Sequence, residues 1–145
     1  MPLNENPTIL LITDNGAEES HTTHILAKYH FTNNVSSFNN PRDAIKFFAT
    51  CTSAEKNPPE PLPEIIILSL RDSGRLNLSM AIESRRGRLE AIPMILVVET
   101  REEEDEIRKL NLPNTAWITR PIGFFKLLEG MQKLKMRWIV LRPNA

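Results

Sequence analysis

The sequence predicts an α/β fold with one doubly wound parallel β-sheet and helices on both of its faces. Short aliphatic runs alternate with segments of helical spacing along the 145 residues, and no internal repeat interrupts the alternation. The strongest run, 65–70, sets large aliphatic residues side by side between a proline-rich segment and a glycine turn. A continuous apolar run of this length is typical of a strand buried on both faces, as in the middle of a parallel sheet.

Five runs have the length and composition of strands. The second run is short and polar, which is typical of an edge strand. Pro93 stands near the start of the fourth run, where a missing N–H donor is tolerated. The predicted strands are 8–13, 35–38, 65–70, 92–98 and 115–119.

Five segments that follow these runs are predicted to be helices. The first has weak helical character because Ser, Thr and His residues at its centre are poor helix formers. Pro41 opens the second, and Thr100 is placed to cap an acidic fourth helix. The predicted helices are 17–29, 42–53, 76–86, 101–110 and 124–136, and the segment 55–63, with four prolines, is expected to be an extended loop.

The alternation of strands and helices predicts a flavodoxin-like fold of five βα units, with strand order 2-1-3-4-5. In open parallel sheets the functional crevice lies beyond the carboxyl ends of the strands, at the point where the strand order reverses. Asp14 and Ser69, at the ends of the first and third predicted strands, are therefore expected to be neighbours there. We expect a single domain over 1–145, with a C-terminal extension at about 137–145.

Composition narrows the function classes. Lys plus Arg and Asp plus Glu each number 18, so no global charge draws the chain to nucleic acid. One cysteine cannot form an internal disulfide, which fits a reducing cytosol. No stretch approaches about 18 uninterrupted apolar residues. We expect a soluble, cytoplasmic protein that binds neither nucleic acid nor membrane.

The chain resembles a receiver domain of two-component response regulators over nearly its whole length. The resemblance is carried by the aliphatic run 9–15, the Ile92-Pro93 strand start, the Arg120-Pro121 step and the Phe124-Phe125 start of the last helix. The proline-rich loop and the tail are most similar to the stand-alone regulators paired with bacterial phytochromes. The resemblance implies a signalling role without enzymatic activity, and a sensor histidine kinase or phytochrome-like photoreceptor as partner.

In that family a strand-three aspartate accepts a phosphoryl group beside Mg²⁺, which it holds with two strand-one carboxylates. The resemblance implies six site positions: Ser69 at the acceptor, Thr13 and Asp14 at the metal carboxylates, Val98 at the switch hydroxyl, Trp117 at the aromatic switch and Arg120 at the phosphoryl-binding lysine. Most of the family's functional groups are replaced here. We therefore expect a pseudo-receiver with no phosphoryl acceptor, no metal beyond weak binding by Asp14, and no cofactor.

Several alternatives remain open. The acceptor could be relocated to Asp72 or Asp14, or the crevice could bind a small ligand. Serine catalysis is disfavoured because none of the histidines is expected beside Ser69. Asp14 is interpreted either as a helix cap or as a ligand, and we favour a structural ion pair between Arg120 and Asp14 over anion binding.

The predicted partner surface comprises the fourth predicted helix, the fifth strand, the last helix and the tail. Its candidate contact residues are Trp117, Phe125, Trp138, Ile139 and Leu141. The four apolar residues 138–141 must cover the domain itself or bury against another chain, which suggests a homodimer.

Overall fold

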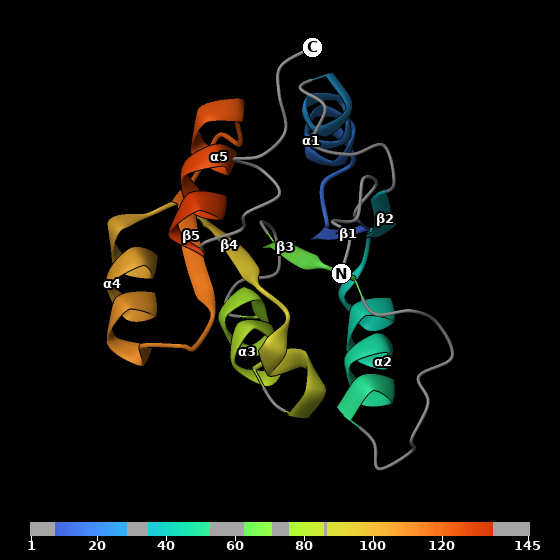
Figure 1. Ribbon diagram of the computed structural model, residues 1–145, viewed down its shortest axis with the longest axis vertical. Helices are drawn as coiled ribbons and strands as arrows, with labels where there is room; N and C mark the ends of the chain where they lie inside the picture. The colour runs from blue at the N-terminus through green and yellow to red at the C-terminus, as the bar shows by residue number, and fades with distance from the viewer. Residues whose placement is uncertain (1–7, 29–34, 53–62, 71–75, 86, 135–145) are drawn as a thin grey trace, which may run out of the picture.

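The computed structural model describes residues 8–28, 35–52, 63–70, 76–85 and 87–134. They form a five-stranded parallel sheet in the order β2-β1-β3-β4-β5, which confirms the predicted flavodoxin-like fold (Figure 1). The strands are β1 (Ile9–Thr13), β2 (Val35–Phe38), β3 (Ile65–Ser69), β4 (Met94–Val98) and β5 (Thr115–Thr119). The fourth strand starts two residues later than predicted, because Pro93 has no N–H to donate to a ladder.

The same described residues also form five α-helices and one 3₁₀ helix. The helices are α1 (Gly16–Lys28), α2 (Pro41–Thr52), α3 (Leu76–Glu83), η1 (Gly87–Ala91), α4 (Arg101–Leu110) and α5 (Phe124–Lys133). The sequence predicted each α-helix but not η1. Thr100 caps α4 as predicted, because its side chain accepts a hydrogen bond from the Glu103 N–H at 3.1 Å.

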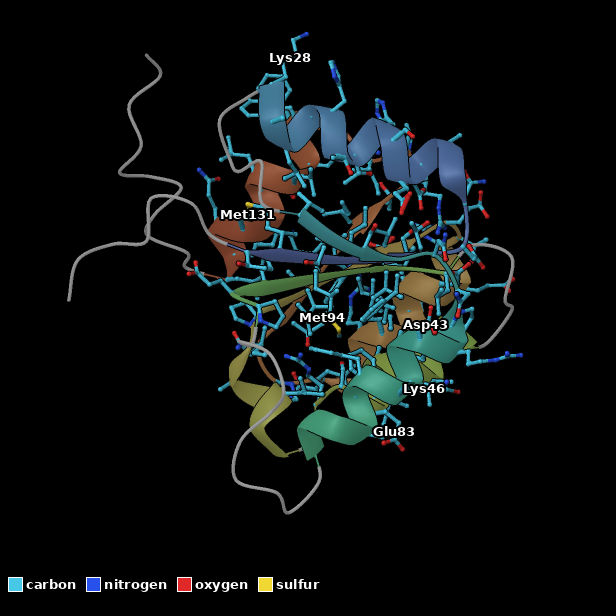
Figure 2. All side chains as sticks on the ribbon, turned by 90° about the vertical axis from the view of Figure 1, so that its right-hand side faces the viewer. Lys28, Asp43, Lys46, Glu83, Met94 and Met131 are labelled. Carbon is cyan, nitrogen blue, oxygen red and sulfur yellow. The ribbon has the colours of Figure 1, made fainter. Side chains whose placement is uncertain are left out.

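The helices form two layers, with α1 and α5 on one face of the sheet and α2, α3 and α4 on the other (Figure 1). Every residue of β1, β3 and β4 is buried, so the predicted two-sided burial of the central strands is confirmed. Alternate side chains along each central strand pack into the two hydrophobic cores on opposite faces of the sheet. Met94 packs with the α2, α3 and α4 layer and Met131 with the α1 and α5 layer, and the two lie on opposite sides of the sheet (Figure 2).

Arg85 links the amino ends of β4 and β5. Its Nη1 donates hydrogen bonds to the Ile92 carbonyl at 2.7 Å and to the Asn114 carbonyl at 3.2 Å. Burial lowers the pKa of Arg85 to about 10, since the charged guanidinium loses its solvent there. A buried cation therefore satisfies carbonyls at the edge of the sheet opposite to the predicted crevice.

The sheet register gathers the carboxyl ends of the central strands. Thr13 pairs with Ser69 across β1 and β3, which confirms that the ends of the first and third strands meet. Asp72 and the tail residues Trp138, Ile139 and Leu141 lie outside the described residues. Among the helices that the structure describes, none is long and apolar enough to cross a membrane.

Candidate functional site

Two hydroxyl side chains stand at the carboxyl ends of the central strands. Thr13 ends β1 and Ser69 ends β3, and both residues are fully buried. Burial of a hydroxyl requires a hydrogen-bond partner, because an unpaired polar group in the interior loses the free energy of its hydration. The partners of these two hydroxyls define the site.

Helix α1 supplies the first partner. Asn15 caps the helix, since its Oδ1 accepts a hydrogen bond from the Glu18 N–H at 2.9 Å. The Asn15 N–H in turn donates to Thr13 Oγ1 at 3.2 Å, so the helix begins directly after β1. This tight start places Glu18 in the first turn, above the ends of the strands.

The carboxylate of Glu18 turns inward and accepts hydrogen bonds from both hydroxyls. Thr13 Oγ1 lies 3.2 Å from Glu18 Oε1, and Ser69 Oγ donates to the same oxygen. Glu18 is a site residue that was not predicted from the sequence. Its carboxylate joins α1 to the end of β3 by the hydrogen bond from Ser69.

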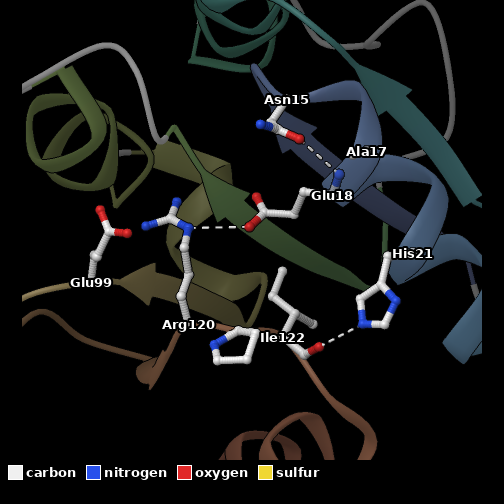
Figure 3. A pocket seen from close by; sticks show the side chains of 8 residues that line it. Asn15, Ala17, Glu18, His21, Glu99, Arg120 and Ile122 are labelled. Atoms are coloured by element: carbon white, nitrogen blue, oxygen red, sulfur yellow. Dashed lines mark hydrogen bonds and ion pairs between the residues drawn. The ribbon is translucent and has the colours of Figure 1, made fainter.

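Arg120, directly after β5, completes the cluster. Its Nε donates to Glu18 Oε2 at 3.1 Å (Figure 3). Its Nη2 donates to Ser69 Oγ at 2.7 Å. The side chains of Arg120 and Glu18 are each only 9% exposed, so the pair is a buried ion pair. An ion pair at this place was predicted, but with Asp14 as the carboxylate; the carboxylate is that of Glu18.

We call Thr13, Glu18, Ser69 and Arg120 the strand-end cluster. Within it Ser69 accepts from Arg120 and donates its single hydroxyl proton to Glu18. The prediction that no base lies beside Ser69 was based on the positions of the histidines. The group that accepts the Ser69 proton is instead the carboxylate of Glu18. Because Ser69 is fully buried, and because Glu18 is ion-paired with Arg120, the arrangement positions the hydroxyl without presenting it to a substrate.

A crevice of about 410 Å³ opens beside this cluster (Figure 3). Its lining residues are Asn15, Ala17, Glu18, His21, Glu99, Arg120, Pro121 and Ile122. His21 Nε2 lies 3.0 Å from the Ile122 carbonyl oxygen, which joins α1 to the segment between β5 and α5. The Glu18–Arg120 ion pair therefore forms part of the crevice wall, and the contact between His21 and Ile122 forms another part.

The cluster is a poor donor set for Mg²⁺. Mg²⁺ binds best to several anionic or neutral oxygens in octahedral geometry. Here a guanidinium lies 3.1 Å from the Glu18 carboxylate and would repel a second cation. In the part of the chain that the structure describes, no three His, Cys, Asp or Glu side chains are grouped as a metal site would require.

The remaining predicted residues lie on or near β4, β5 and α5. Val98 ends β4 and is buried in the core, where its apolar side chain offers no hydrogen bond. Trp117 is half-buried against the same core, with the Arg108 guanidinium 5.9 Å from its ring centroid. Phe125 is 79% exposed at the start of α5 and packs edge to face on Phe124.

Comparison with known proteins gives structural matches only. No family model matches the chain, and no curated protein matches it. The bacteriophytochrome response regulator AtBRR is 24% identical, covers 98% of this chain with 100% of its own, and superposes with a TM-score of 0.77. The corresponding regulator RtBRR is 21% identical over 97% of this chain and 84% of its own, with a TM-score of 0.73.

A third structure is the signal receiver domain of a signal transduction histidine kinase from Syntrophus aciditrophicus. It is 19% identical over 96% of both chains, with a TM-score of 0.67. These neighbours are two bacteriophytochrome response regulators and one signal receiver domain, and their identities to this chain are low. The comparison shows that the chain has the receiver-domain fold.

Proposed function

We propose that this chain is a receiver-type signalling domain that does not accept a phosphoryl group at β3 and acts by binding another signalling protein. The observation that carries the proposal is the state of Ser69. Its hydroxyl is fully buried and is held between Glu18 and Arg120 at the point where the family resemblance implies an aspartate acceptor.

Electrostatics at the strand-end cluster oppose phosphoryl transfer. Transfer requires a nucleophile that a phosphodonor can approach, and a cation that neutralises the charge of the moving group. Ser69 offers a buried hydroxyl, and the cation nearest to it, Arg120, is already paired with Glu18. A phosphoryl group on Ser69 would place further negative charge against the Glu18 carboxylate, which is unfavourable at hydrogen-bond distance.

The same reasoning supports a domain without Mg²⁺ and without enzymatic activity of its own. Glu18 is neutralised by Arg120, so a divalent cation gains little from this carboxylate. Asp14 is the remaining strand-one acid, and a single carboxylate binds Mg²⁺ weakly. Signalling would then depend on which protein the domain binds.

The proposed partner is a sensor histidine kinase or a phytochrome-like photoreceptor. Two of the structural neighbours are bacteriophytochrome response regulators, which supports this class of partner. The contact surface that we propose includes Phe125, which leaves 79% of its surface in solvent, and the half-buried Trp117.

The tail residues 138–141 are proposed to form a homodimer contact, and deletion of 138–145 is expected to lower the sedimentation mass to that of a monomer. An unchanged mass after the deletion would refute the dimer contact.

A labelling experiment tests the loss of acceptor chemistry. The purified chain is incubated with acetyl phosphate, with and without Mg²⁺, beside a receiver domain that is known to be labelled. Intact-mass spectrometry is expected to show no phosphoryl adduct on this chain. An acid-labile, hydroxylamine-sensitive adduct would overturn the proposal, and its location at Asp14 or Asp72 would establish the relocated acceptor.

A further inference from the structure

We propose that Thr13, Ser69 and Arg120 form a binding site for a planar carboxylate, and that the side chain of Glu18 is its built-in ligand. The inference rests on one part of the proposed function, namely that Ser69 donates its hydroxyl proton to Glu18 and takes no phosphoryl group. It adds a specific chemistry to that function. The carboxylate of Glu18, a residue of the same chain, occupies the site.

Donors from three separate strand ends converge on the two oxygens of one carboxylate. Glu18 Oε1 accepts from Ser69 Oγ and lies 3.2 Å from Thr13 Oγ1, while Oε2 accepts from Arg120 Nε at 3.1 Å. Each oxygen therefore has its own donors, as in sites that select a planar anion. Arg120 also orients Ser69, because its Nη2 donates to Ser69 Oγ at 2.7 Å.

Because the site is buried, its cation requires a bound anion. Thr13 and Ser69 are fully buried, and the Arg120 side chain is 9% exposed. A buried guanidinium without a counter-ion is strongly unfavourable. If the Glu18 side chain were removed, Arg120 and the two hydroxyls would remain as a preformed site that lacks only its ligand.

An external ligand can reach that position. Glu18 and Arg120 both line the 410 Å³ crevice, so the space next to the carboxylate is continuous with an open cavity. The Glu18→Ala substitution removes one methylene and one carboxylate, a fragment the size of acetate. Acetate, which is planar at its carboxylate and carries one negative charge, is therefore the matched external ligand.

The test is chemical rescue of the Glu18→Ala variant of the full chain. Thermal unfolding is measured in sodium acetate and in sodium chloride at equal ionic strength. Acetate is expected to raise the Tm of Glu18→Ala saturably, by roughly 3–6 °C over chloride when acetate exceeds its dissociation constant tenfold. The wild type and Glu18→Gln should not respond, because in both a side chain fills the site.

Two further variants isolate the site. Glu19→Ala removes the neighbouring acid of the same helix, and we expect it to respond no more than the wild type. Adding Arg120→Met to Glu18→Ala should abolish the acetate effect, since it removes the cation of the site. Equal acetate effects in Glu18→Ala and Glu19→Ala, or a persistent effect without Arg120, would overturn the inference.

If Glu18→Ala does not fold in chloride, the folded fraction recovered on refolding in acetate becomes the measurement, and no recovery refutes the site. Phosphodonor labelling of the wild type separates the two proposals. A wild type labelled at Asp14 or Asp72, with an acetate-responsive variant, would overturn only the proposed function. An unlabelled wild type with an unresponsive variant would overturn only the carboxylate site.

Discussion

Replacing Arg120 with methionine tests how much the strand-end cluster contributes to stability. Methionine keeps much of the length of the side chain and removes the charge. The substitution leaves the Glu18 carboxylate 9% exposed and without its cation, and it deprives Ser69 of the donor at 2.7 Å. Breaking one side of a buried ion pair costs about 3–5 kcal/mol, so we expect the free energy of unfolding to fall by that amount.

The expected loss is large but measurable. A domain of this length has about 5–15 kcal/mol of stability in total, so the variant should still fold at low temperature. At roughly 2–4 °C per kcal/mol, the Tm should fall by about 6–20 °C. Urea unfolding followed by circular dichroism gives the free energy, and an unchanged m value shows that the unfolding reaction is the same.

A double-mutant cycle assigns the loss to the pair. Combining Arg120→Met with Glu18→Leu removes both charges, and apolar replacement of a buried pair is often neutral or stabilising. The double variant should therefore lose less than the sum of the single variants, with a coupling energy of about 2 kcal/mol.

Lys133→Met is the matched control, since Lys133 pairs with Glu129 at 3.2 Å where both side chains are more than half exposed. Its cost should stay below about 1 kcal/mol. A comparably small cost for Arg120→Met, with additive effects in the cycle, would refute the buried pair.

Three further variants test the packing, each by urea unfolding against the wild type. The Oγ1 of Thr22 is buried and has no hydrogen-bond partner among the residues that the structure describes, so Thr22→Val should raise the unfolding free energy by about 1 kcal/mol. A loss of stability would contradict this. Arg85→Met should lower the unfolding free energy by about 1–3 kcal/mol, because the Ile92 carbonyl loses its hydrogen bond from Arg85 while the Asn114 carbonyl keeps the one from the Met94 N–H. A gain in stability would show that desolvation of the guanidinium dominates. A Cβ at Gly130 would lie 3.2 Å from Ile95 Cδ1 and 3.3 Å from Ile118 Cγ2, so Gly130→Val should lower the unfolding free energy by about 1–3 kcal/mol. An unchanged stability would show that α5 can move away from the sheet.

The central sheet could be predicted from the sequence because burial on both faces leaves an unbroken apolar run. The run 65–70 and the strand β3 nearly coincide, and the strand order followed from the alternation of strands and helices. The 3₁₀ helix η1 could not be predicted. Its five residues carry no apolar period of their own, and a single short turn is fixed by the packing of Leu89 and Ile92 in the core.

The positions of the site were predictable for a different reason. Parallel strands end at one edge, so Thr13 and Ser69 had to meet there once the strand order was known. A buried cation after β5 had to find an anion, and this predicted the ion pair of Arg120. The identity of the anion depended on the direction of a helical side chain, which strand order and register do not specify.

Glu18 was missed because its place in the sequence has an ordinary explanation. Asn15 followed three residues later by Glu18 is the spacing of a capping box, in which the glutamate returns to the N–H of the cap residue. In this chain Thr13 Oγ1 accepts that N–H instead, and so the Glu18 carboxylate is available to Ser69 and Arg120. The hydroxyls at 13 and 69 are necessary for this arrangement, because they donate hydrogen bonds where the carboxylates implied by the family resemblance would repel Glu18. The two hydroxyls and the inward turn of Glu18 therefore depend on one another, and they give a cluster in which the carboxylate of Glu18 is balanced by Arg120 within the chain.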